Sequence, residues 1–160
     1  MKEQIRSKPE IMAKLKEGSL GIAVICCIAA LLTLVISALR LFNTALNETD
    51  LIQRYTVCRG FVSGILTAAI MTAAAVMFFR IAKDGIPFTA KNVRTVRIIG
   101  ILFLVNAVIP SVTAAGFIGT ANGVGGIVNP SALAEGLLFL FIAHIIRYGA
   151  MLQQESDETL

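Results

Sequence analysis

Residues 20–39 read LGIAVICCIAALLTLVISAL, a run of twenty residues without a charged side chain. A helix of this length rises about 30 Å, which matches the hydrocarbon core of a bilayer. A second uncharged run of equal length, residues 60–79, lies between Arg59 and Arg80. Both runs predict membrane-spanning helices, and they indicate an all-α fold.

Two further apolar stretches complete the predicted fold. Residues 98–118 contain Pro110, which removes a backbone donor, as membrane helices tolerate where neighbouring helices cover the gap. Residues 132–148 contain Glu135 and His144, but residues 137–143 are strongly apolar, so a tilted helix can still span. We therefore expect a four-helix transmembrane bundle.

The composition supports this prediction. Hydrophobic residues make up 56% of the chain and charged residues 15%, which is too apolar for a water-soluble domain of 160 residues. No polar segment exceeds about 20 residues, so residues 1–160 are predicted to form one integral membrane domain in the lipid bilayer. The net charge of +4 lies mainly beside the apolar runs, and we expect no direct contact with nucleic acid.

Lysine and arginine divide unevenly between the two sides of the predicted bundle. Eleven lie in the first segment, in the connection between the second and third runs, and at the end of the fourth run. Only Arg40, Arg54 and Arg59 lie on the other side. Since basic residues favour the cytoplasmic side, we expect both termini to be cytoplasmic.

The first segment has the pattern of a short amphipathic N-terminal helix. Ser7 and Glu10 have the spacing of a helix cap, and Ile11, Met12 and Leu15 share one face among lysines. We expect this helix to lie on the inner membrane surface. A docking site for a partner protein is the alternative.

Small residues recur at every fourth position of the second run: Gly60, Gly64, Ala68 and Thr72. Such a stripe lets another helix backbone approach closely. We expect it to pack against a helix of the same chain. The alternative is a contact between two copies in a homo-oligomer.

Three polar residues fall within the predicted spans: Asn106, Glu135 and His144. Burying such groups in lipid is costly, so they are candidates for a proton or cation path as well as for structural roles. Glu135 and His144 are nine residues apart and lie on opposite faces of one helix, so they form no local ligand pair. Asn106 is the residue that we consider within reach of His144.

No motif indicates an enzyme. Cys26 and Cys27 are adjacent and Cys58 stands alone, so there is no Cys-x-x-Cys pair and no metal-binding spacing. There is also no nucleophile elbow, zinc motif or phosphate loop. We expect no catalytic residue, cofactor or metal site.

The connection at residues 80–97 carries the most distinctive pattern. Gly85 and Pro87 predict a turn, and Thr89 predicts the cap of the next helix. A basic strip follows at three-residue spacing, for which anionic headgroups or a protein partner are the expected contacts. It consists of Lys91, Arg94 and Arg97, and the acidic residues Glu155 and Asp157 of the tail are predicted to lie on the same side.

Two stretches carry a family resemblance: Gly85-Ile-Pro-Phe-Thr followed by Asn92-Val, and Gly149-x-x-Leu152-x-x-Glu155-x-Asp157-x-Thr159-Leu160. They resemble the bacterial membrane proteins catalogued as domain of unknown function 2975. This resemblance implies a protein of the bacterial cytoplasmic membrane, often neighboured by a small helix-turn-helix regulator. It implies no established catalytic residue.

The leading functional hypothesis is therefore a regulatory or partner-binding membrane protein that acts at the cytoplasmic face. The alternative is a small transporter or channel subunit, which is motivated by the polar residues within the spans.

Overall fold

The computed structural model describes residues 2–47, 50–118 and 128–158. In these ranges the chain forms helices α1 (Lys2–Asn47), α2 (Leu51–Asp84), α3 (Ala90–Ile118) and α4 (Pro130–Glu158), and no strand. Each helix is long and apolar enough to cross a membrane. The predicted all-α fold with four spanning helices is confirmed, although the helices extend beyond the predicted apolar runs.

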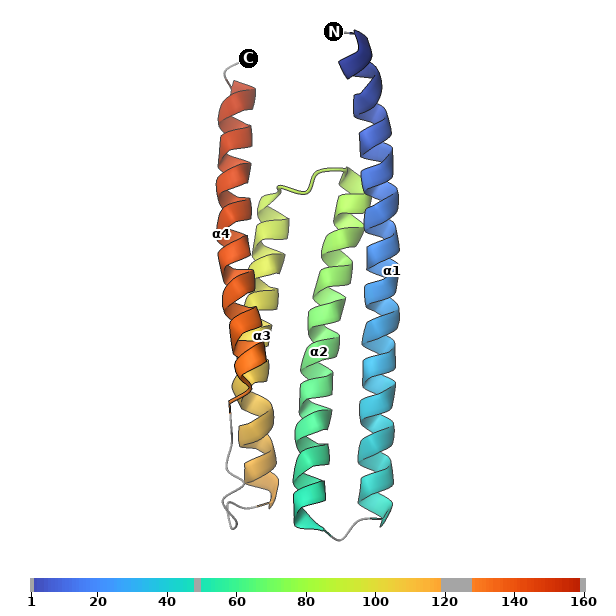
Figure 1. The fold of residues 1–160 in the computed structure, drawn as a ribbon, viewed down its shortest axis with the longest axis vertical. Coiled ribbons are helices and arrows are strands. Elements are labelled where there is room, and N and C mark those ends of the chain that lie inside the picture. Colours follow the sequence, from blue (N-terminus) through green and yellow to red (C-terminus); the bar gives the residue numbers. More distant parts are fainter. Residues whose placement is uncertain (1, 48–49, 119–127, 159–160) are drawn as a thin grey trace.

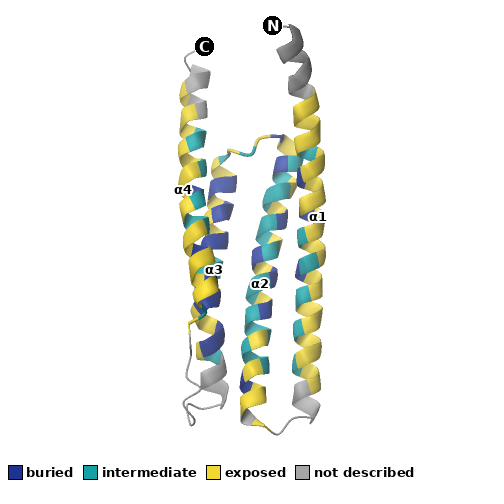
Figure 2. Cartoon of the chain, viewed as in Figure 1, coloured by how far each residue is buried: buried dark blue, intermediate teal, exposed yellow. Residues whose placement is uncertain are grey.

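The four helices stand side by side in chain order and form an open bundle (Figure 1). Helix α1 contacts α2, α2 contacts α3, and α3 contacts α4, whereas α1 and α4 do not meet within the described ranges. Burial is greatest on α3, and α1 and α4 expose long apolar faces (Figure 2). Lipid chains are as apolar as these side chains, so exposing them in a bilayer carries little cost.

Both chain ends lie at the same end of the bundle as the α2–α3 connection (Figure 1). We call this end the terminal face. The N-terminal part of α1 and the C-terminal part of α4 project beyond the connection, one at each edge of the row. The terminal face therefore consists of a short central turn between two helical projections.

The N-terminal segment is helical, as predicted, but it is the first part of α1 and not a separate helix. Between it and the first apolar run lie only Gly18 and Ser19, and a single glycine costs a helix about 1 kcal/mol. The side chains of Met12 and Lys16 lie against Gly85 of the α2–α3 connection. This contact favours continuing the helix past the end of the apolar run.

The contact between α1 and α2 depends on Gly64. A Cβ atom added there would overlap the hydroxyl of Ser37 on α1 and lie 2.8 Å from its Cβ atom. Ala68, one turn further on, is also buried. By contrast, Gly60 has open space around it, and the exposed Thr72 donates its hydroxyl to the Ala68 carbonyl at 2.8 Å. Of the predicted stripe, Gly64 thus lies against α1 of the same chain.

The contact between α3 and α4 is built from two glycines and two aromatic rings. A Cβ atom added to Gly100 would lie 3.0 Å from the Gly136 carbonyl oxygen, and one added to Gly136 would lie 2.7 Å from Leu104 Cδ2. The rings of Phe103 and Phe139 stack with centroids 5.4 Å apart. Each glycine therefore allows the backbone of the other helix to approach closely.

Helix α3 continues through Pro110. One turn earlier, the carbonyl of Ala107 accepts the backbone N–H of Asn129 at 2.9 Å. Asn129 in turn caps α4, because its Oδ1 atom accepts both the backbone N–H and the hydroxyl of Ser131, at 3.2 and 2.7 Å. The start of α4 is thereby fixed to the side of α3.

Candidate functional site

The α2–α3 connection is held by local caps. Gly85 adopts φ 72°, in the left-handed region, and its N–H donates to the Ile81 carbonyl at 2.8 Å. The hydroxyl oxygen of Thr89 accepts the backbone N–H of Asn92 at 3.2 Å, which caps α3. The predicted turn at Gly85 and the predicted cap at Thr89 are both confirmed.

The buried side chain of Asn92 forms a hydrogen bond to the α2–α3 connection. Its side chain is 2% exposed, and its Nδ2 atom donates to the Pro87 carbonyl at 3.0 Å. Nearby, Arg80 of α2 donates to the hydroxyl of Thr95 on α3 at 3.2 Å. These bonds fix the end of α2 relative to the start of α3. Arg94 and Arg97 lie in this first part of α3.

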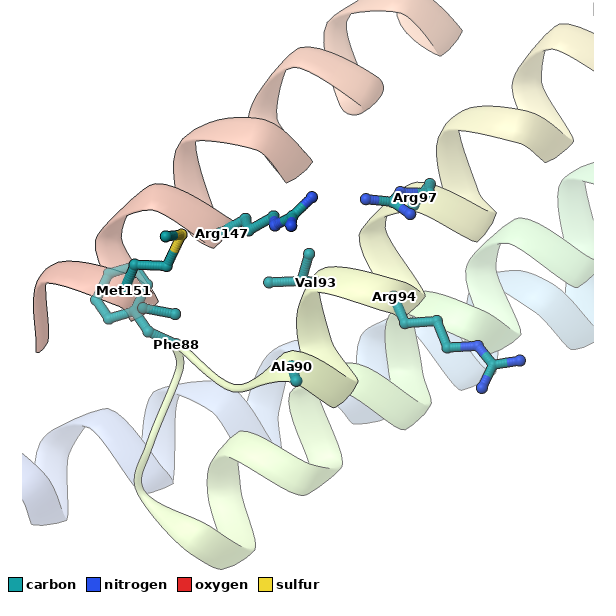
Figure 3. Close-up of a pocket in the computed structure, with 8 residues that line it drawn as sticks. Phe88, Ala90, Val93, Arg94, Arg97, Arg147 and Met151 are labelled. Carbon is teal, nitrogen blue, oxygen red and sulfur yellow. The ribbon is translucent and has the colours of Figure 1, made fainter. Parts of the chain in front are cut away.

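A cleft of about 680 Å³ lies between α3 and α4 at the terminal face (Figure 3). We call it the terminal cleft. One part of its wall is apolar and the other carries three arginines. The lining residues are Phe88, Ala90, Val93, Arg94, Arg97, Arg147, Ala150 and Met151.

Two members of the predicted basic strip, Arg94 and Arg97, line the terminal cleft together with Arg147 of α4. In Figure 3 the guanidinium groups of Arg97 on α3 and Arg147 on α4 point toward one another, whereas Arg94 points away from both. Lys91 is exposed and does not line the cleft. Sequence spacing did not single out Arg147, because its partner lies fifty residues earlier in the chain.

The predicted contact between the basic strip and the acidic tail stays a prediction. Glu155 lies exposed on α4. The side chain of Asp157 lies outside the described part of the chain.

The three polar residues of the predicted spans do not gather at one place. Asn106 is 9% exposed, and its Oδ1 atom has no hydrogen-bond partner among the described residues. Glu135 and His144 are exposed on α4. Because Ala107 meets Asn129, His144 lies fifteen residues further along α4, about 22 Å from the level of Asn106. The expected approach of Asn106 to His144 is therefore wrong.

No metal-binding cluster of three His, Cys, Asp or Glu side chains occurs within the described ranges. Cys26, Cys27 and Cys58 are free thiols on α1 and α2. The absence of catalytic activity remains a prediction.

The two stretches that carry the family resemblance come together in the structure. A Cβ atom added to Gly149 would lie 3.8 Å from Phe88 Cδ1, in ordinary van der Waals contact. A family model described as "Protein of unknown function (DUF2975)" matches residues 42–160, more than two thirds of the chain. The chain belongs to this family. No curated protein and no solved structure matches it.

In this DUF2975 protein the family match covers α2, α3 and α4 but only the end of α1. It includes every residue of the terminal cleft. The cleft is therefore the candidate site that belongs to the family part of the chain.

Proposed function

We propose that this protein is a non-enzymatic protein of the bacterial cytoplasmic membrane, with both termini in the cytoplasm, that binds a cytoplasmic protein partner at its terminal face. The observation that carries the proposal is the pair of exposed apolar side chains, Phe88 of the connection and Met151 of α4, that line the terminal cleft. Their side chains are 47% and 53% exposed. Exposed apolar side chains that are surrounded by charged residues are typical of protein-binding surfaces.

The projecting helix ends support the same proposal. The N-terminal seventeen residues carry five basic and three acidic side chains, whereas the last nine residues of α4 carry three acidic side chains and no basic one. The two projecting segments therefore differ in the charge of their sequences, and a partner at the terminal face would lie between them. Complementary charges orient a partner and exclude others.

The partner that we propose is a small helix-turn-helix regulator. The family resemblance supports this choice, as such regulators often neighbour these proteins. In this proposal the regulator contacts nucleic acid, and the membrane protein sets how much regulator is free in the cytoplasm.

Site-specific photo-cross-linking in native membranes tests the proposal. A photoreactive amino acid replaces Phe88 or Met151 in cells that also produce the regulator. The matched control carries the same amino acid at Phe141, which is 64% exposed on the same helix as Met151 but lies within the predicted span. We expect the regulator to cross-link from Phe88 and Met151 and not from Phe141.

Recovery of only self-linked copies from Phe88 and Met151 would contradict partner binding. It would favour a homo-oligomer at this face. A second contradiction would be an unchanged cellular phenotype after the 85–97 connection and the acidic tail are replaced.

One observation favours the alternative of a small transporter or channel subunit. The Oδ1 atom of Asn106 is buried in the predicted span without a partner among the described residues, and such groups often mark ion paths. Ion flux in proteoliposomes tests this function. A Glu135→Gln or Asn106→Leu variant that conducts as the wild type does removes that side chain from the mechanism.

A further inference from the structure

Two arginines from different helices converge in the terminal cleft. The guanidinium groups of Arg97 and Arg147 face each other (Figure 3), and no carboxylate is among the residues that line the cleft. Like charges repel, and this repulsion is stronger beside a low-dielectric bilayer than in water. An anion placed between the two guanidinium groups would attract both of them and offset their repulsion.

The chemistry of the two groups selects the anion. A guanidinium is a planar fork of N–H donors that matches the oxygens of phosphate in pairs. Two forks that approach from opposite sides offer donors to both free oxygens of a phosphodiester. Arg94 is also positively charged, but its side chain points away from Arg97 and Arg147. It would therefore not contact a phosphate that is bound between those two residues (Figure 3).

The position of Arg97 and Arg147 relative to the predicted bilayer indicates that the phosphate belongs to a lipid. Arg97 directly precedes the apolar run that begins at Ile98, and Arg147 lies at the end of the fourth apolar run. Both guanidinium groups thus stand where a predicted span ends, at the level of the lipid headgroups. The cleft walls beside them, Val93 and Ala150, are apolar.

We propose that Arg97 and Arg147 together bind the phosphate of one anionic phospholipid in the terminal cleft. This site goes beyond the proposed partner binding and does not depend on it. Given the predicted orientation, the lipid comes from the cytoplasmic leaflet. The bound headgroup joins α3 to α4 at the end that lies away from the Gly100–Gly136 contact.

Native mass spectrometry of the full-length protein in detergent tests the proposal, with phosphatidylglycerol and phosphatidylcholine as the probes. The variants are Arg97→Gln and Arg147→Gln, and Arg94→Gln is the control because it removes an equal charge one turn away. We expect selective retention of phosphatidylglycerol. We also expect roughly tenfold weaker binding in either of the first two variants, as loss of a charge-assisted hydrogen bond predicts.

Arg94→Gln should change phosphatidylglycerol binding by no more than about twofold, as expected for an exposed arginine of the cleft wall that points away from the bound phosphate (Figure 3). Equal losses in all three variants would overturn the proposal, because the effect would then follow net charge alone. Equal retention of phosphatidylcholine would also overturn it. Thermal unfolding of each variant verifies that the fold is intact.

A soluble phosphate compound is the other source of the same chemistry. Inorganic phosphate and glycerol 3-phosphate are therefore added in excess over phosphatidylglycerol. We expect neither to displace the lipid, and displacement would overturn the assignment to a lipid. Cross-linking from Phe88 is measured separately, so loss of lipid binding and loss of partner binding are distinguishable.

Discussion

Two helix contacts depend on glycine, the one between α1 and α2 and the one between α3 and α4. They differ in which atoms of the neighbouring helix lie against the glycine. On α2, Gly64 makes room for one side chain, Ser37. Between α3 and α4, Gly100 and Gly136 each make room for the other's backbone, and a backbone hydrogen bond to Asn129 fixes the far end. Rotation about χ1 can move the Ser37 hydroxyl, though not its Cβ atom, away from a steric conflict, whereas a backbone atom moves only if its helix moves.

This difference indicates which helix pair holds its geometry more rigidly. The terminal cleft lies at the end of the α3–α4 pair, within the part of the chain that the family covers. A binding site that depends on two arginines from two helices requires a fixed spacing between those helices. The predictions below compare the two contacts directly.

The largest effect is expected for Gly136→Ala. The new methyl group would lie 2.7 Å from Leu104 Cδ2 and 3.0 Å from the Gly100 carbonyl oxygen. We expect the free energy of unfolding to fall by about 3 kcal/mol, the upper range for an overpacked contact. Thermal unfolding in detergent measures it. A matched Gly60→Ala variant, with open space around the glycine, should be neutral or more stable.

A smaller loss, about 2 kcal/mol, is expected for Gly64→Ala because the conflict is with a single side chain. The new methyl group would lie 2.8 Å from Ser37 Cβ. Adding Ser37→Gly to this variant removes the conflicting atoms, so the double variant should recover most of the loss. If Ser37→Gly gives no recovery, the Gly64 stripe packs against something other than α1, such as a second copy.

Asn129→Ala should lower the free energy of unfolding by about 1 kcal/mol, the usual cost of losing a helix cap. Its side chain accepts from the backbone and the hydroxyl of Ser131, while its backbone bond to Ala107 does not depend on the side chain. Hydrogen exchange should show faster opening of the first turn of α4 only. Faster exchange throughout α3 would contradict this assignment.

The smallest effect is expected for Asn106→Leu. The side-chain oxygen of Asn106 is buried without a described partner, so replacing the amide with an apolar group of similar size should leave stability unchanged or raise it by up to about 1 kcal/mol. Thermal unfolding measures the change. A clear loss of stability would show that this amide has a partner, which would remove the observation that favours the transporter alternative.

The α2–α3 connection shows how much of the site was predictable. Gly85 and Thr89 have local roles, a left-handed turn and a helix cap, and both could be predicted from the residues themselves. Arg147 could not be selected in this way. Its role depends on the side of α4 that faces α3, and the spacing of residues within one segment does not contain that information.

The sequence by itself determined the four apolar helices, because twenty uncharged residues cannot remain in water and must satisfy their backbone groups inside a bilayer. Only the tertiary structure decided that the helices form an open row, that α1 continues unbroken to Lys2, and that Arg97 faces Arg147. The physical reason is that any apolar face of a helix can lie against lipid at little cost. Which faces meet therefore depends on close packing at Gly64, Gly100 and Gly136, and not on hydrophobicity.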